Sequence, residues 1–546
     1  MEDLKQIKES LIHEIEQRQV DKIIENTNAQ LIIKLIKSAK NINEAISVAQ
    51  LGTTYKRTGF HFDKRLEKMS DTIKYLKKNE SLSFKGKKDE IKHELIIGDN
   101  YDALLNLLVE YRGKIDVIYI DPPYGKDSMG EFAEVNYDND LTRDNLLSML
   151  YPRLVLAQQL LSDDGFIFIS IDDKNEAYIK CLCDEIFSEI NFRTLMTVVA
   201  NPGGRDYGGI AKTTEFVLVY SKTPEPLLVK IDSEDHNFKL SDEYGKFELR
   251  ELRNRNTKFN DGNRPNLCYP FYVDERDVDE HGLYNISLEK DENHTVEVMP
   301  LKSQGIQTVW RWGKEERARK NLNINIKAKK KKDGTYMIVE KYRDEKVMLK
   351  NILSDKQFRT ENGSLELKSI MKEKVFDYPK PVEIPKILIQ TFDNKDAIVL
   401  DFFAGSGTTG QAVMELNRED GGNRKFILCT NNDKTDINPN GIAYDVTSKR
   451  LKRIMTGCCY DGSKDFDWIK NNKPYDDSLN VYEINTVSNF ESQQGQTPFD
   501  VIDETCYGKN RFMSIKEKVE WICNNFEVTE RTIENDDEWN KRMEES

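Results

Sequence analysis

Two stretches of the chain, residues 86–225 and 376–460, alternate short apolar runs with segments of helical periodicity. Ile115–Ile120 and Gly165–Ile171 are nearly continuous apolar runs, typical of strands that are buried on both faces. Between such runs, segments like 101–111 place their apolar residues at helical spacing. Strands that alternate with helices indicate a mainly parallel sheet covered on both faces. The pattern therefore predicts an α/β fold built in two halves.

The other three segments lack this alternation and suggest how the domains are organised. Residues 1–85 begin with apolar positions at helical spacing, which predicts a helical N-terminal region. Residues 226–375 are polar and irregular, with a predicted hairpin between 323–330 and 336–342. An insertion of this size between two halves of a sheet is a natural place for a recognition domain. Residues 461–546 form an acidic C-terminal region, which we expect to be a domain for dimer or partner contact.

Bulk composition limits the class of protein. The chain has 546 residues and a net charge of −14, which argues against a protein that coats DNA by bulk charge but allows a local basic channel. No apolar run approaches the ~20 residues that span a bilayer, and the start of the chain lacks the features of a secretion signal. None of the eight cysteines forms a CxxC pair. We expect a cytoplasmic protein with no membrane segment and no metal site.

A candidate catalytic motif, Asp121-Pro122-Pro123-Tyr124, directly follows the apolar run Ile115–Ile120. An exocyclic amino group of a nucleic-acid base is a poor nucleophile, because its lone pair is delocalised into the ring. The Asp121 carboxylate and the Pro122 carbonyl could accept its N–H groups, and Tyr124 offers a ring on which an extruded base could stack. The two prolines would stiffen the turn. Alone, the motif is equally consistent with a surface turn, but its place after a buried strand favours catalysis.

A second strand–loop–helix unit surrounds Gly405 and Gly407, which allow the backbone to approach a ligand closely. With Gly410 they fit GxGxxG, so the loop alone leaves NAD or FAD open. That fingerprint also requires an acidic residue at the end of the next strand, and the strand 425–430 ends without one. Asp401 precedes the loop and either orients it or contacts the cofactor. Together with the catalytic motif, the loop predicts S-adenosylmethionine. The candidate cofactor residues here are Asp401, Phe403, Ala404, Gly405, Ser406, Gly407, Thr408 and Thr409.

Asp99 is a further candidate for cofactor binding, because it ends a predicted strand at the edge of the sheet where ligands gather in open α/β folds. An N-cap role for the following helix is about equally consistent with its position, and the two roles are compatible.

Residues 302–332 form a basic stretch in which Trp310 and Trp312 are interleaved and only Glu315 and Glu316 are acidic. Basic residues mixed with aromatic ones suit a nucleic-acid surface. A solvated charged hairpin is the alternative for the lysine run, and core packing is a strong alternative for the tryptophans. The candidate DNA contacts are Arg311, Lys314, Lys329, Lys330, Lys331 and Lys332.

Taken together, these motifs resemble a known family. They stand in the order Gly98-Asp99-Asn100, Tyr119 to Tyr124, Leu141 to Asp144, Ser170 to Asp173, Glu215 to Lys222, Trp310-Arg311-Trp312, Tyr378 to Val382 and the glycine loop. The chain resembles the Mod (modification) subunit of type III restriction–modification systems, within the β class of adenine-N6 DNA methyltransferases. The resemblance covers residues 90–460 well and the ends loosely.

The resemblance implies a Rossmann-like methyltransferase sheet in permuted order. Its catalytic half would be residues 86–225, its cofactor half 376–460, and its target-recognition domain the insertion at 226–375. S-adenosylmethionine would bind the glycine loop, with Lys380-Pro381-Val382 at the edge of the pocket. The resemblance also implies double-stranded DNA as substrate, a homodimer, and a Res subunit, an ATP-dependent translocase and nuclease, as partner. The strand after the glycine loop lacks the usual ribose-binding carboxylate, since no acid follows until Asp433.

Two other functions stay open. The same fold could methylate cytosine N4 or an amine in RNA, although cytosine-N4 enzymes tend to have serine where Asp121 stands. Alternatively, the chain could be a DNA-recognition subunit that guides a nuclease and methylates little itself, although the intact motif at 121–124 argues against this.

Overall fold

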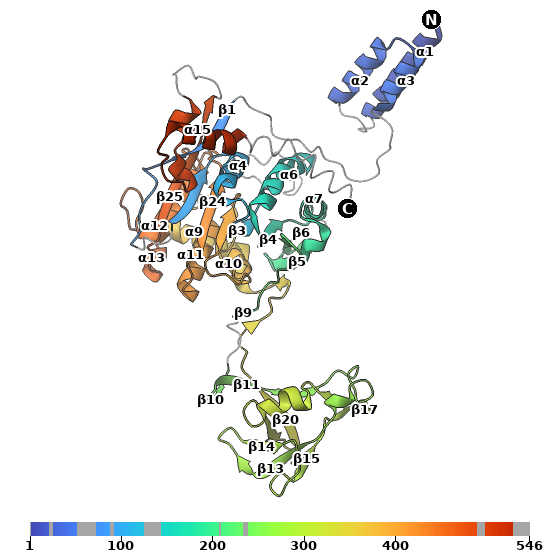
Figure 1. Ribbon diagram of the computed structural model, residues 1–546, viewed down its shortest axis with the longest axis vertical. Helices are drawn as coiled ribbons and strands as arrows, with labels where there is room; N and C mark the ends of the chain where they lie inside the picture. Colours follow the sequence, from blue (N-terminus) through green and yellow to red (C-terminus); the bar gives the residue numbers. More distant parts are fainter. Residues whose placement is uncertain are drawn as a thin grey trace. The chain divides into compact units, whose positions relative to one another are not determined.

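The computed structural model describes residues 2–20, 26–51, 72–87, 92–124, 143–206, 209–232, 238–344, 346–488 and 497–527 (Figure 1). The chain divides into two compact units, Met1–Lys64 and Arg65–Ser546. The first unit contains α1 (Glu2–Val20), α2 (Asn26–Ser38) and α3 (Ile42–Leu51). These helices bury one another's apolar faces around Ile15, Ile33 and Ile36, so the predicted helical start is confirmed here.

The prediction that residues 1–85 are helical is wrong near the end of this range, where Thr72–Lys78 form the strand β1. It pairs antiparallel with β25 (Ser478–Ser488), which in turn pairs parallel with β2 (Lys92–Ile97). Residues 461–546 therefore contribute a strand to the main sheet instead of forming only a separate domain. The partner of β1 lies about four hundred residues away, and its own sequence is half polar, so no local pattern marked it as a strand.

The main sheet has ten strands in the order β1-β25-β2-β24-β23-β3-β4-β8-β5-β22. From β25 to β4 neighbouring strands are parallel, whereas β8 runs antiparallel to both β4 and β5. The mainly parallel α/β sheet predicted from the sequence is thus confirmed. Beyond β1, β2 and β25, its strands are β3 (Ile115–Ile120), β4 (Leu161–Ile171), β5 (Phe192–Val199), β8 (Thr214–Ser221), β22 (Ile352–Leu353), β23 (Ile398–Asp401) and β24 (Lys425–Thr430).

Helices cover both faces of this sheet (Figure 1). On one face α4 (Asn100–Tyr111) packs beside α6 (Arg143–Leu160), and α6 beside α7 (Glu176–Phe187). On the other, α10 (Glu383–Gln390) packs beside α11 (Thr408–Asp420), and α12 (Ser448–Thr456) beside both α11 and α9 (Thr360–Met371). Burial of both sheet faces explains why the central strands are continuous apolar runs.

The insertion forms a separate seven-stranded sheet in the order β10-β11-β20-β19-β14-β13-β15. Its own core contains Trp310 and Trp312, so the core-packing alternative for these two residues is confirmed. The predicted hairpin is confirmed as β19 and β20. The insertion is narrower than 226–375, because β22 and α9 belong to the main sheet and its core. The strands are β10 (Leu240–Asp242), β11 (Gly245–Glu251), β13 (Phe271–Val278), β14 (Leu283–Ser287), β15 (Val296–Val298), β19 (Ile326–Lys330) and β20 (Tyr336–Tyr342).

Shorter elements connect these parts. They are β6 (Arg205–Asp206), β7 (Ala211–Lys212), β9 (Ile231–Asp232), β12 (Arg253–Asn254), β16 (Lys302–Ser303), β17 (Ile306–Gln307), β18 (Val309–Trp310), β21 (Lys346–Val347), α8 (Arg319–Asn321), α13 (Trp468–Asn471), α14 (Pro498–Val501) and α15 (Ile515–Ile522). Among the described residues, no helix is long and apolar enough to cross a membrane.

Candidate active site

The two predicted motifs lie on neighbouring strands. β3 pairs parallel with β23, with Val117 opposite Val399 and Ile118 opposite Leu400. The segment after β3 carries the catalytic motif, and the segment after β23 is the glycine loop. Because parallel strands end at the same edge, both motifs meet at the carboxyl edge of the sheet, where ligands bind in open α/β folds.

The side chains of the catalytic motif are held together by hydrogen bonds. The Tyr124 hydroxyl donates to Asp121 Oδ1 at 3.0 Å, and the buried Asn175 donates to the Tyr124 carbonyl at 2.8 Å. Pro122 is buried and Pro123 is half-buried, as expected for a stiff turn. The Asp121 side chain remains 26% exposed, so its carboxylate is accessible to a ligand.

Lys380, predicted at the edge of the cofactor pocket, contacts the catalytic motif. Its ammonium donates to the Tyr124 hydroxyl at 2.6 Å and lies 3.4 Å from Asp121 Oδ1. It also donates to Glu215 in β8, a residue that the site prediction omitted. The run from Glu215 to Lys222 was visible in the sequence, but Lys380, the partner of Glu215, lies 165 residues away. A role for Lys380 at the cofactor edge stays a prediction.

The charges in this cluster perturb one another. Burial raises the pKa of Asp121, the Lys380 ammonium lowers it, and Glu215 raises it again. Burial would lower the pKa of Lys380, but Asp121 and Glu215 together raise it well above its usual value. Lys380 is therefore a protonated cation between two carboxylates at neutral pH.

Asp401 organises the glycine loop. It is buried, and it accepts hydrogen bonds from the Phe403 backbone N–H at 2.9 Å and the Thr409 hydroxyl at 2.5 Å. Of the two predicted roles, orientation of the loop is thus confirmed, and contact with the cofactor stays a prediction. Burial raises the pKa of Asp401 to about 7, because these two hydrogen bonds only partly offset its loss of solvent.

Two glycines determine the backbone path of the loop itself. Gly405 and Gly407 have φ values of +46° and +82°, in the left-handed region that favours glycine. A Cβ atom on Gly405 would lie 3.2 Å from Phe376 Cζ, and one on Gly407 would lie 3.3 Å from Thr447 Cγ2. Ala404, Ser406 and Thr408 are buried, so they support the loop rather than project from it. The residues present therefore fit the close approach of a nucleoside-like cofactor.

Arg450 of α12 hydrogen-bonds to the glycine loop, a role that was not predicted from the sequence. Its guanidinium is 1% exposed and donates to the carbonyl and hydroxyl of Ser406, to the Thr408 hydroxyl and to Gln411 Oε1. Burial lowers its pKa to about 10. The helical periodicity of this segment could have placed Arg450 on a buried face, and an arginine there would have been the signal.

Asp99 caps α4, as one of its two predicted roles required. Its carboxylate accepts from the Tyr101 backbone N–H at 2.8 Å, and Arg153 pairs with it at 3.1 Å. The next residue, Asn100, donates to the Phe402 carbonyl at 2.8 Å. This segment therefore adjoins the glycine loop, and cofactor binding by Asp99 stays a prediction that is compatible with the cap.

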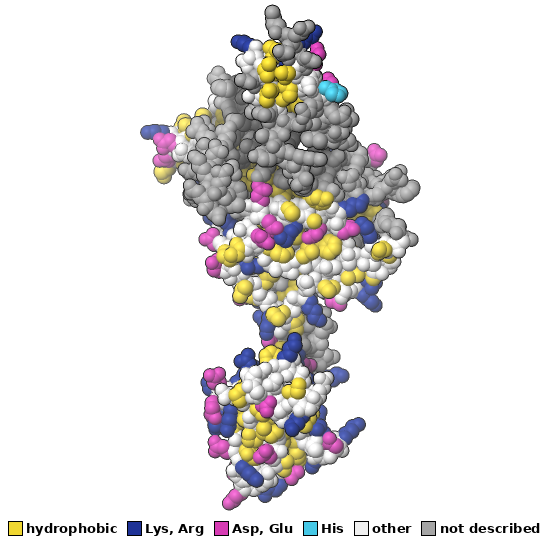
Figure 2. Space-filling view, turned by 90° about the vertical axis from the view of Figure 1, so that its right-hand side faces the viewer, with side chains coloured by type: hydrophobic (Ala, Val, Ile, Leu, Met, Phe, Trp, Pro, Cys, Tyr) yellow, Lys and Arg dark blue, Asp and Glu magenta, His cyan; other side chains and the backbone are white. Residues whose placement is uncertain are grey.

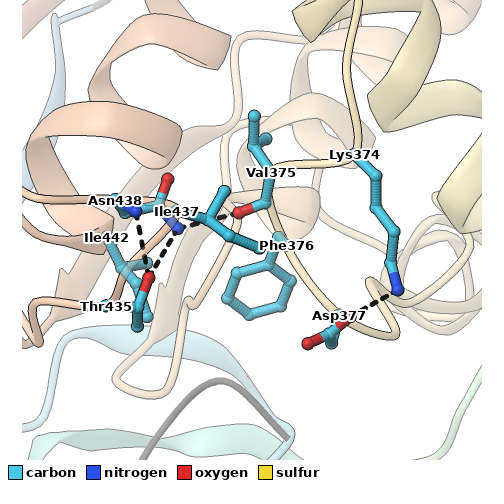
Figure 3. Close-up of a pocket in the computed structure, with 8 residues that line it drawn as sticks. All are labelled: Lys374, Val375, Phe376, Asp377, Thr435, Ile437, Asn438 and Ile442. Atoms are coloured by element: carbon cyan, nitrogen blue, oxygen red, sulfur yellow. Dashed lines mark hydrogen bonds and ion pairs between the residues drawn. The ribbon is translucent and has the colours of Figure 1, made fainter.

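A hollow lies beside the glycine loop, between the segment before α10 and the loop after β24 (Figure 3). The Asn438 side chain links its two walls by donating to the Val375 carbonyl at 2.9 Å. The Phe376 ring in the same wall faces Gly405. Its lining residues are Lys374, Val375, Phe376, Asp377, Thr435, Ile437, Asn438 and Ile442. None of them was predicted, because they belong to two irregular segments far apart in sequence.

The predicted DNA contacts divide into two groups. Arg311 is engaged within the inserted domain, where it pairs with Glu340 at 2.8 Å and donates to the Glu251 carbonyl. Lys329 and Lys332 are exposed and have no ion pair within the described ranges, whereas Lys330 lies 3.8 Å from Glu275.

Lys331 is half-buried beside Asp333, and Lys314 begins a short π-helical turn. Basic and acidic side chains are mixed on the lower domain in Figure 2, so a DNA surface there would depend on local lysines rather than on a uniform patch. In the part of the chain that the structure describes, no group of His, Cys, Asp and Glu could hold a metal ion.

Comparison with known proteins identifies the family. A family described as DNA methylase, of the N6 and N4 type, matches residues 115–445. The chain belongs to this family. S-adenosylmethionine is the methyl donor of the family, which agrees with the predicted cofactor. A second family, described only as an uncharacterised conserved protein, matches residues 8–117.

Among curated relatives of this DNA methylase, the EcoPI Mod subunit of a type III restriction–modification enzyme from Escherichia phage P1 is 31% identical over 412 residues, or 66% of this chain and 62% of that protein. The StyLTI Mod subunit of Salmonella typhimurium is 33% identical over 62% of this chain and 52% of its own length. The chain thus spans less than two thirds of these two relatives. The type II methyltransferase M.KpnI of Klebsiella pneumoniae is 31% identical over 70% of this chain and 91% of its own length.

Solved structures are more distant. The cytosine-N4-specific PvuII DNA methyltransferase has a TM-score of 0.32 at 11% identity, over 65% of this chain and 87% of that one. The complex of M1.HpyAVI with SAM has a TM-score of 0.31 at 15% identity, over 66% of this chain and 98% of that one.

Proposed function

We propose that this DNA methylase transfers a methyl group from S-adenosylmethionine to adenine N6 in DNA, as the modification and recognition subunit of a type III restriction–modification system. The main support for the proposal is the parallel pairing of β3 with β23. Because of this pairing, the segment with Asp121 and Tyr124 and the glycine loop follow neighbouring strands at the same edge of the sheet. Two relatives, the EcoPI and StyLTI Mod subunits, belong to type III restriction–modification enzymes, which favours this class over a solitary methyltransferase.

The chemistry follows from the site. When bound, S-adenosylmethionine supplies an electrophilic methyl carbon, and the segment from Asp401 to Thr409 would hold it. Asp121 would accept an N–H of the target amine, which makes the nitrogen lone pair more available. Tyr124 would stack on a base extruded from the duplex. No covalent intermediate is needed, because positioned groups and preorganised dipoles supply the rate.

The proposed partners follow from the same class. Double-stranded DNA is the substrate, a second copy of this chain completes a homodimer, and a Res subunit supplies ATP-dependent restriction. Co-expression with a Res subunit, followed by light scattering of the chain alone and of the purified complex, tests both protein partners. The cytoplasm is the expected compartment for such a complex.

Incubation of the purified chain with unmethylated DNA and labelled S-adenosylmethionine tests the activity. Mass spectrometry of the digested nucleosides then separates N6-methyladenine from N4-methylcytosine, and an RNA substrate tests the remaining alternative. Asp121→Ala should reduce methylation at least ~100-fold, the loss typical of removing one positioned polar group. Near-normal transfer by that variant would refute the assignment, and DNA binding without any transfer by the wild type would favour a subunit that only guides a nuclease.

A further inference from the structure

Three charged side chains from distant parts of the chain meet at the catalytic motif. Asp121 follows β3, Glu215 lies in β8, and Lys380 precedes α10. The Lys380 ammonium contacts Glu215 Oε2 and lies 3.4 Å from Asp121 Oδ1. It also donates to the Tyr124 hydroxyl at 2.6 Å, and that hydroxyl donates to Asp121 at 3.0 Å.

The burial of the Lys380 side chain suggests a role beyond connecting separate segments of the chain. Its side chain is only 11% exposed, whereas Asp121 and Glu215 are 26% and 29% exposed. A buried ammonium thus lies between two partly exposed acidic side chains at the catalytic motif. The Coulomb energy of such a group is larger than in water, because the surrounding protein has a low dielectric constant.

We propose that Lys380 and Glu215 are positioning residues of the target-base pocket, in which Lys380 holds Asp121 as an acceptor and fixes Tyr124, while Glu215 balances the charge of Lys380. The inference rests on the proposed function, since it assigns roles around the same amine. It moves Lys380 from the cofactor edge to the target base, and it adds Glu215 to the site.

The two residues should act on Asp121 in opposite directions. Among the described residues, the ionisable groups that face Asp121 are Tyr119 and Tyr124 from its own segment, Lys380, Glu215, and Asp401 from β23. Lys380 lowers the pKa of Asp121 and Glu215 raises it, against a background of burial that also raises it. Loss of Lys380 should therefore extend the protonated, inactive form of Asp121 to higher pH, and loss of the Glu215 charge should do the reverse.

The test is single-turnover methylation by the full chain at saturating S-adenosylmethionine and saturating DNA, between pH 5 and pH 9. The variants are Lys380→Met, Lys380→Arg and Glu215→Gln. Lys386→Met is the matched control. The side chain of this α10 lysine is 14% exposed and also pairs with two carboxylates, Glu383 and Glu419, but its ion pairs lie outside the catalytic motif.

We expect the methylation rate of Lys380→Met to fall at least ~10-fold at pH 6 and to recover in part at pH 9. In the plot of rate against pH, the acid limb, where the rate falls towards low pH, is then displaced to higher pH. Glu215→Gln should displace the same limb to lower pH, Lys380→Arg should return it towards the wild type, and Lys386→Met should leave it unchanged. The dissociation constant of S-adenosylmethionine, measured by calorimetry, should change less than ~3-fold in every variant.

An acid limb that stays in place in both Lys380→Met and Glu215→Gln overturns the inference. So does a Lys380→Met variant that is normal at saturating cofactor but binds S-adenosylmethionine weakly, because that places Lys380 at the cofactor. A wild-type chain that methylates no nucleic acid overturns the proposed function, and the inference with it, whereas an active wild type isolates the test of Lys380. If Lys380→Met does not fold, the direction of the Glu215→Gln displacement still decides the question.

Discussion

Replacement of Arg450 by methionine tests whether the glycine loop depends on support from α12. The guanidinium has four acceptor atoms within hydrogen-bond distance, namely the carbonyl and hydroxyl oxygens of Ser406, the Thr408 hydroxyl and Gln411 Oε1. Methionine fills a similar volume but donates to none of them. The hydroxyl oxygens of Ser406 and Thr408 lie 3.3 Å apart, so these two groups can hydrogen-bond to each other when the guanidinium is lost. Gln411 has no such substitute among these acceptors.

The magnitude follows from two opposing contributions. A hydrogen bond to a charged group stabilises by roughly 1.5–3 kcal/mol, and we take about 1.5–2 kcal/mol for each of these four bonds. Burial lowers the pKa of Arg450 from 12.5 to about 10, which corresponds to roughly 3 kcal/mol spent on desolvating the cation. The difference is a net loss of about 3–5 kcal/mol on substitution. For a unit as large as Arg65–Ser546 we expect the melting temperature to fall by about 3–5 °C.

Two measurements check this prediction, namely thermal unfolding and calorimetric titration with S-adenosylmethionine. We expect cofactor affinity to fall at least ~10-fold, equivalent to ~1.4 kcal/mol, because the loop loses its anchor. Arg453→Met is the matched control. Arg453 lies one turn further along α12 and donates to the Ile370 carbonyl at 2.8 Å, away from the loop. That variant should lose stability and keep its cofactor affinity.

A role of α12 in shaping the glycine loop is excluded if Arg450→Met binds the cofactor as tightly as the wild type, or if Arg450→Met and Arg453→Met weaken binding equally. In the first case the loop would hold its shape without α12. In the second, any loss of stability would explain the effect.

Three further predictions concern the loop and the inserted domain. Gly405→Leu should weaken cofactor binding in calorimetry with the fold intact by circular dichroism, because a Cβ there meets Phe376 at 3.2 Å and φ is +46°. The pKa of Asp401 is raised to about 7, so the folded apoprotein binds a proton that the unfolded chain has released; its free energy of unfolding should fall as pH rises from ~4 through 7, and Asp401→Asn should flatten this slope in denaturant titrations. Replacing Lys329 through Lys332 by glutamine should weaken binding to all DNA sequences alike and reduce its salt dependence, whereas an unchanged slope would mean a solvated hairpin.

The strands around the site could be predicted from the sequence because their signal is local. Ile115–Ile120 and Lys425–Thr430 are apolar runs, and they form β3 and β24 with those bounds. The helical segment predicted at 101–111 is likewise α4, which spans Asn100–Tyr111. In each case the segment itself carries the periodicity that its buried position requires.

Contacts between distant segments could not be predicted in this way. Nothing near Lys380 in sequence indicates that its ammonium reaches Glu215 and Tyr124, because the three residues meet only when the sheet has formed. The same holds for β1, because its partner β25 follows all the other strands of the sheet in sequence. Arg450 is an intermediate case, since the amphipathic helix was visible but the acceptors that its buried guanidinium contacts were not.

Under the proposed function, the order of the segments separates chemistry from recognition within this chain. The site is assembled from the segment after β3, from β8, and from the segment that leads into β23, and each is held by the main sheet. The two ends of the inserted domain are joined to each other by the antiparallel pair β9 and β21, before β22 returns to the sheet beside β5. Because the domain has its own core, substitutions within it need not disturb the strands that hold Asp121 and Asp401. Under the proposed function, such a chain can change the DNA sequence that it recognises while it keeps the same reaction.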